Sequence, residues 1–260
     1  MQEKKILVNN VNTVVKIYGE GSPQQAGRPF LILHGWNSSS DKWIEVAETL
    51  SKRGLKVFVP DLPGFGKSDA LQIPWNTNKY VNWVEEFVKS QPELRSEFYL
   101  LGHSFGGALA SKYVVKHPQE VKKLFLVSAA CIRKKTAKKS LFQKVSKVVK
   151  LFYFLPYYSF FRRAVYKFVI KKSDYLYVDG IIKETYLNVI SDNLSFHLPF
   201  IKAPVVIIWG DKDEMTPIED ARFIQNQIKN SKLSIIQGAG HDLNRKPPEV
   251  LSEKVLENLN

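Results

Sequence analysis

Short apolar runs recur along the chain and alternate with segments in which apolar residues return every three or four positions. The apolar runs predict buried parallel strands at residues 30–33, 56–59, 98–101, 123–127, 205–209 and 232–236. The helical spacing predicts helices at residues 40–53, 78–90, 108–115 and 217–228, and a last helix from residue 248. This alternation implies an α/β fold, in which helices cover both faces of a mostly parallel sheet.

Turn and cap signals complete this outline. Residues 5–8 and 14–18 predict an N-terminal β-hairpin, because a polar turn rich in asparagine separates two alternating runs. Ser40 and Asp41 predict the N-cap of the helix that follows. The alternation fails between residues 131 and 200. The length of 260 residues therefore suits one core domain, made of residues 1–130 and 201–260, with an insertion.

One predicted strand-to-helix turn carries a serine between two glycines, in the sequence Gly-His-Ser-Phe-Gly at residues 102–106. Small residues at both flanks allow the strand and helix backbones to approach closely in a strained turn. Such a turn presents the Ser104 hydroxyl at the carboxyl end of the sheet and directs the amide of Phe105 toward an incoming carbonyl oxygen. The pattern is that of a nucleophile elbow, G-x-S-x-G.

A serine hydroxyl needs a general base before it can act as a nucleophile. His241 is the candidate base, because it lies on a loop of small residues after the strand predicted at 232–236 and can reach across the sheet edge. His34 follows a strand and is expected to shape a loop. His103 adjoins the serine, and its side chain is expected to point away from it.

The base in turn needs an acid that orients it. Asp213 is the candidate acid, because it follows the buried strand predicted at 205–209, and Asp211 is the alternative. The order Ser104, Asp213, His241 along the chain is the order expected of triads built around this type of elbow.

Five blocks of the chain resemble the α/β-hydrolase family of serine hydrolases, of the esterase and lipase type. They are Leu-His-Gly-Trp at residues 33–36, Asp-Leu-Pro-Gly-Phe-Gly-Lys-Ser at 61–68, Gly-His-Ser-Phe-Gly-Gly at 102–107, Trp-Gly-Asp-Lys-Asp at 209–213 and Gly-His at 240–241. The resemblance implies an α/β-hydrolase fold, with a helical cap at residues 131–200. It supports Asp213 over Asp211 and implies that the amides of Trp36 and Phe105 form the oxyanion hole. Trp36 is also expected to contact substrate.

The cap stretch has an unusual composition. Fifteen Lys and Arg residues lie between residues 122 and 172, and no acidic residue occurs between Glu120 and Asp174. The net charge of +13 comes from this segment, because the rest of the chain is nearly balanced. Aromatic residues are also concentrated there, and we expect three of them to line the acyl pocket: Phe154, Tyr157 and Phe161.

The basic, aromatic cap predicts an anionic partner, which would be an acidic carrier protein, an anionic membrane surface or a substrate with its own carboxylate. The blocks at 34–36 and 61–66 also look like those of pimeloyl-carrier-protein methyl ester esterases, whose basic caps bind an acidic carrier. The alternative is that the aromatic residues pack on the core while the lysines stay solvated. Nucleic acid is not expected to bind, because no known binding module is present.

These residues together predict a serine hydrolase that cleaves small carboxylic esters through an acyl-enzyme on Ser104. Hydrolysis of a carbon–carbon bond in ring-cleavage products is an alternative, although similar enzymes of that kind have Trp after the histidine, where this chain has Asp242. Amidase or peptidase action on small substrates is another, for which Glu184 and Asp192 would have to supply the acidic contact. A ligand receptor without catalytic activity is the third.

The sequence predicts no metal or organic cofactor, because no spacing typical of metal ligands occurs. Neither a signal peptide nor an apolar run of about 18 residues occurs, so no membrane span is expected. Cys131 is the only cysteine, so the chain has no internal disulfide, which suits a reducing compartment. We therefore expect a cytoplasmic protein.

Overall fold

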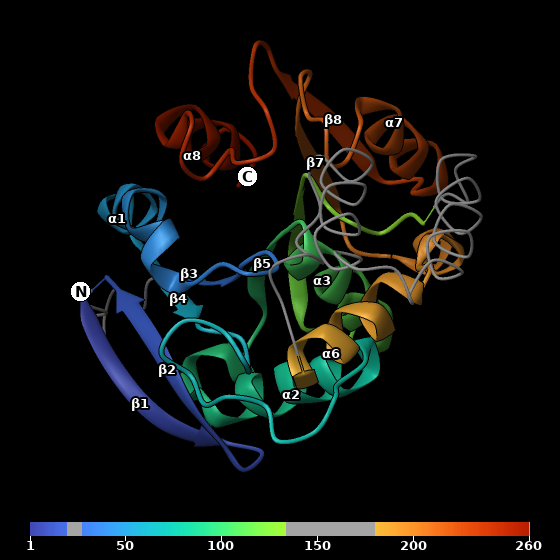
Figure 1. The fold of residues 1–260 in the computed structure, drawn as a ribbon. Coiled ribbons are helices and arrows are strands. Elements are labelled where there is room, and N and C mark those ends of the chain that lie inside the picture. The colour runs from blue at the N-terminus through green and yellow to red at the C-terminus, as the bar shows by residue number, and fades with distance from the viewer. Residues whose placement is uncertain (20–27, 134–179, 260) are drawn as a thin grey trace, which may run out of the picture.

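The computed structural model describes residues 1–19, 28–133 and 180–259, which form one sheet with helices on both sides (Figure 1). The sheet in these ranges has the strand order β1-β2-β4-β3-β5-β6-β7-β8. Its strands are β1 (Gln2–Val8), β2 (Val11–Tyr18), β3 (Arg28–Leu33), β4 (Leu55–Pro60), β5 (Phe98–His103), β6 (Val121–Val127), β7 (Val205–Gly210) and β8 (Ser231–Ile236). Strand β2 runs antiparallel to β1 and β4, and the strands from β4 to β8 are parallel.

Helices cover both faces of this sheet because alternate residues of its central strands point to opposite sides. The α-helices are α1 (Ile44–Lys52), α2 (Thr77–Ser90), α3 (Phe105–Lys116), α6 (Gly180–Ser191), α7 (Ile218–Gln227) and α8 (Pro248–Leu256). In β5, Leu100 belongs to the apolar core that also contains side chains of α2, α3 and α7, while Leu101 belongs to a second core with side chains of α1 and α8. Both side chains are fully buried, so β5 lies at the centre of the sheet between two apolar cores (Figure 1).

The mostly parallel sheet and its two helical layers confirm the predicted α/β fold. The predicted hairpin, strands and helices appear with their bounds shifted by at most a few residues. The expected N-cap at Ser40 and Asp41 is wrong. Residues Ser40–Trp43 form a 3₁₀ turn, η1, without a side-chain cap. The Asp41 carboxylate pairs with Lys16 instead, and the buried Ser40 hydroxyl has no hydrogen-bond partner in the described structure, while the Ser40 amide donates to Asp61.

Within the predicted cap, the structure describes residues 180–200. They form helix α6 and a 3₁₀ segment, η4 (Ser195–Phe200), and α6 lies over the sheet edge near α2 and α3 (Figure 1). The other described part of that stretch, residues 131–133, follows β6. No helix in the described ranges combines the length and apolar character that a bilayer-spanning helix needs.

Candidate active site

Ser104 occupies the turn between β5 and α3, in a strained conformation with φ 52° and ψ −115°. The turn is tight, because a Cβ atom on Gly106 would lie 2.0 Å from the carbonyl oxygen of Leu33 in β3. Neighbouring strands hold it in place: the Ser104 amide donates to the Val127 carbonyl, and the Ser104 carbonyl accepts from the Ala130 amide, both at 2.9 Å. The elbow that the sequence predicts is therefore formed, and it fixes Ser104 at the carboxyl edge of the sheet.

Asp213 lies on the turn after β7 and has hydrogen bonds to both carboxylate oxygens. Oδ1 accepts from the amides of Met215 and Thr216 at 2.9 Å, and Oδ2 accepts from the Thr216 hydroxyl at 2.8 Å. The His241 ring lies 2.8 Å from Oδ2 through Nδ1. Burial raises the pKa of Asp213, but the hydrogen bonds and the interaction with His241 outweigh it and hold the pKa below its usual value.

His241 lies on the loop after β8, next to the turn that carries Asp213. The backbone hydrogen bond from Lys212 to Ala239, 2.9 Å long, joins these two loops. Because a carboxylate can only accept, Nδ1 of His241 carries the proton in this pair, and Nε2 of the neutral ring is left as a proton acceptor. Asp213 therefore selects the tautomer that a general base requires.

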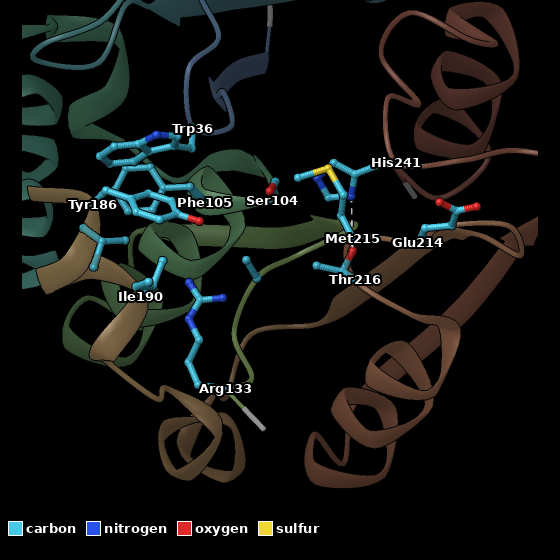
Figure 2. Close-up of a pocket in the computed structure, with 12 residues that line it drawn as sticks. Trp36, Ser104, Phe105, Arg133, Tyr186, Ile190, Glu214, Met215, Thr216 and His241 are labelled. Atoms are coloured by element: carbon cyan, nitrogen blue, oxygen red, sulfur yellow. Dashed lines mark hydrogen bonds between the residues drawn. The ribbon is translucent and has the colours of Figure 1, made fainter. Parts of the chain in front are cut away.

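Ser104 and His241 line the same cavity (Figure 2). No hydrogen bond joins the Ser104 hydroxyl to the His241 ring in the described structure. Such bonds in hydrolases often shorten only when substrate is bound. The structure thus brings all three predicted side chains to one edge of the sheet, with the acid and base bonded and the serine facing the same space.

The candidate oxyanion loop lies directly against the serine. A Cβ atom on Gly35 would be 3.3 Å from the Ser104 Cβ, so the backbone leading into Trp36 passes beside the hydroxyl. Phe105 is the first residue of α3, and its amide therefore has no acceptor within the helix. The Trp36 ring contacts those of Phe105 and Tyr186, with ring centres 5.5 Å and 5.2 Å apart.

Two buried histidines support these loops. His103 Nε2 lies 2.9 Å from the backbone carbonyl of His241 and must donate to it, because a carbonyl only accepts. His34 accepts from the Leu62 amide through Nε2 and lies 2.8 Å from the Gly35 carbonyl through Nδ1. Burial lowers the pKa of both rings, in His103 to about 3, so both stay neutral at physiological pH.

The cavity has a volume of about 260 Å³. It is lined by Trp36, Ser104, Phe105, Ala130, Arg133, Tyr186, Val189, Ile190, Glu214, Met215, Thr216 and His241. Of the residues expected to contact substrate, Trp36 is in this lining, while Phe154, Tyr157 and Phe161 lie outside the described residues. Sequence reasoning missed Arg133, Tyr186 and Thr216.

The missed residues differ in whether the sequence could have identified them. Thr216 follows shortly after Asp213, and a hydroxyl beside a carboxylate on a turn could have been found from that spacing. Tyr186 carries no local signal. Across the described ranges, no group of three or more His, Cys, Asp or Glu side chains is placed to hold a metal ion.

A strained serine after β5, an acid after β7, a histidine after β8 and this strand order together define an α/β hydrolase. A family model described as serine aminopeptidase, S33, matches residues 24–247, and the chain belongs to that family. The family resemblance drawn from the five sequence blocks is thereby confirmed.

Relatives of this chain include lipases from bacteria and mammals. The chain is similar to Lipase 1 of Psychrobacter immobilis, with 27% identity over 86% of this chain and 74% of that protein. It is also similar to the monoacylglycerol lipase ABHD6 of Mus musculus, with 23% identity over 89% of this chain and 76% of that protein. Among solved structures, a putative lipase from Acinetobacter baumannii AYE superposes with a TM-score of 0.75 at 23% identity, covering 99% of this chain and 90% of that one.

Proposed function

We propose that this protein hydrolyses carboxylic esters through an acyl-enzyme on Ser104. The observation that carries the proposal is the 2.8 Å contact between Asp213 and His241 on the cavity that also holds the strained Ser104. The names of the similar proteins, which include lipases and a monoacylglycerol lipase, support an ester as the substrate class.

The proposed reaction begins when the ester carbonyl enters the cavity beside Ser104. His241 takes the hydroxyl proton through Nε2 while the serine oxygen attacks the carbonyl carbon. Asp213 keeps the ring in the required tautomer and stabilises the imidazolium that forms. His241 then gives the proton to the leaving alcohol, which leaves the acyl group on Ser104. In the second half of the reaction, His241 takes a proton from water, the water oxygen attacks the acyl carbon, and His241 returns the proton to the Ser104 oxygen as the acid leaves.

The amides of Trp36 and Phe105 would stabilise the oxyanion that forms during attack. Both residues line the cavity, and both backbones adjoin Ser104. Losing one such donor costs roughly 10²–10³-fold in rate in comparable sites, so both amides carry a substantial part of the expected catalysis.

The described cavity lining carries one residue of each charge, Arg133 and Glu214. Glu184 and Asp192, the acidic residues weighed as a contact for a substrate with a free amino terminus, are absent from that lining. The choice of an ester over such a peptide therefore rests on the names of the similar proteins.

The proposal is tested with p-nitrophenyl esters from acetate to palmitate. The wild type should hydrolyse at least part of this series, and Ser104→Ala should reduce turnover to the background rate. Ser111→Ala is the matched control, because Ser111 lies on α3 outside the cavity and its hydroxyl bonds only within the protein interior. If the wild type cleaves no ester, or Ser104→Ala retains activity, the proposal is wrong and a ligand receptor becomes the better account.

The same series tests the partner proposed for the basic stretch at residues 122–172. Most of that stretch lies outside the described residues, so the proposal rests on its charge. Anionic liposomes should activate hydrolysis if the stretch binds a membrane surface, and they should leave the rates unchanged if the lysines are only solvated.

A further inference from the structure

Arg133 lies at the same sheet edge as Ser104. It follows β6, and its amide donates to the Asn193 side chain at 3.2 Å, which ties this segment to the residues after α6. Figure 2 shows the guanidinium group extending into the cavity toward Tyr186 and Phe105. Arg133 and Ser104 therefore face a common space from two different segments of the chain.

No described carboxylate forms an ion pair with Arg133, although Glu214 lines the same cavity. The Nε atom of Arg133 is buried without a hydrogen-bond partner, and the guanidinium forms no ion pair with any residue that the structure describes. Burial lowers the pKa of Arg133 and has a larger effect than the electrostatic interactions with Cys131, Tyr186, Asp192 and Asp220, which raise it. Asp192 lies 3.5 Å from the Lys112 ammonium.

This arrangement is unfavourable for the protein unless an anion joins it. Burial lowers the pKa of Arg133, which reflects the cost of desolvating the charge, yet an arginine stays protonated in proteins. A mostly buried cation that pairs with no carboxylate of the described ranges destabilises the structure. Apolar side chains around it, such as Val189 and Ile190, provide no compensation.

We propose that Arg133 binds a free carboxylate on the substrate, so that the preferred ester carries a negative charge at its other end. This inference rests on the proposed ester hydrolysis at Ser104. The planar guanidinium matches a carboxylate with two parallel hydrogen bonds. No second Lys or Arg is among the described lining residues, which suits a single charge better than the nearly double charge of a phosphate monoester.

The size of the cavity favours a short substrate. Its volume of about 260 Å³ is below the ~300–1,000 Å³ of sites for drug-sized ligands, and the reacting serine and the arginine lie in the same cavity. Half-esters of short dicarboxylic acids, such as monomethyl succinate, glutarate and adipate, therefore match both the volume and the charge.

The test compares these monomethyl esters with the neutral dimethyl esters of the same acids. The wild type should have a kcat/KM at least about tenfold higher for the monomethyl ester of the preferred acid, since a charge-assisted pair is worth about ten- to hundredfold in binding. Arg133→Gln should bring the ratio of the two kcat/KM values, monomethyl to dimethyl ester, close to one, chiefly through a higher KM for the charged ester. Arg133→Lys should recover part of the preference.

Arg222→Gln is the matched control, because Arg222 is exposed on α7 and outside the cavity, and this change removes the same charge from the protein. Arg222→Gln should keep the wild-type ratio of kcat/KM between the monomethyl and dimethyl esters. Succinate should also inhibit the wild type competitively, and more strongly than inorganic phosphate does.

Three results would overturn the inference: equal kcat/KM for both esters in the wild type, an unchanged ratio in Arg133→Gln, or stronger inhibition by phosphate. The first two leave ester hydrolysis in place, since the dimethyl esters are still cleaved. If the wild type cleaves neither these esters nor p-nitrophenyl esters, the proposed function itself fails.

Discussion

Replacing His103 with Gln should make folding less sensitive to acid. His103 is 5% exposed, and burial is the largest cause that lowers its pKa to about 3. In the unfolded chain a histidine has a pKa of about 6.5. Between about pH 3 and pH 6.5, this histidine therefore binds a proton in the unfolded state but not in the folded state. The stability that depends on neutral His103 is complete above about pH 6.5 and is lost as the pH falls toward 3.

The size of the effect follows from these two pKa values. Linkage gives a loss of about 2 kcal/mol of folding stability between pH 7.5 and pH 5 from His103 alone. A Gln side chain does not titrate and still offers a donor to the His241 carbonyl. His34 contributes in the same direction, but it is present in both proteins, so the difference between them isolates His103.

The assay is urea unfolding followed by tryptophan fluorescence at the two pH values. The wild type should lose about 2 kcal/mol more than His103→Gln between pH 7.5 and pH 5. His103→Phe is the matched variant without a donor: it should share the weaker pH dependence but have lower turnover, because the His241 carbonyl loses its partner. Equal pH dependence in all three proteins would refute the reasoning.

Three further changes test the site and the fold. Asp213→Asn should lower kcat by about 10⁴-fold in ester hydrolysis assays, because an amide no longer selects the His241 tautomer. Thr216→Val removes the 2.8 Å hydrogen bond to Asp213 and should lower kcat by about tenfold, measured with the same ester. Gly106→Ala places a Cβ atom 2.0 Å from the Leu33 carbonyl oxygen and should lower the free energy of unfolding by about 3 kcal/mol or more in urea titrations. A wild-type kcat in Asp213→Asn or Thr216→Val, or a wild-type free energy of unfolding in Gly106→Ala, would contradict the role assigned to that contact.

The sequence predicted the parts of the fold that depend on local pattern. Buried strands such as β5 and β7 appear as continuous apolar runs, and the elbow at Ser104 has a fixed five-residue signature. The N-cap expected at Ser40 and Asp41 was wrong, because the Asp41 carboxylate pairs with Lys16 of β2. That contact joins segments far apart in the sequence, and no local pattern predicts it.

The pocket lining was harder to predict for the same physical reason. Tyr186 reaches the cavity because α6 packs beside Trp36, and no periodicity reports a contact between segments so far apart. Arg133 was one of fifteen basic residues in a stretch that we interpreted as a charged surface. The signal that separates it from the others is its place just after β6, at the edge where the parallel strands end.

Covalent labelling of the serine tests the central claim most directly. The wild type, incubated with a fluorophosphonate ester and analysed by peptide mass spectrometry, should carry one adduct on Ser104, and the adduct should be absent from Ser104→Ala. Formation should also be much slower in His241→Ala, because the base is missing. An adduct on a different residue, or equal labelling of Ser104→Ala, would contradict the account.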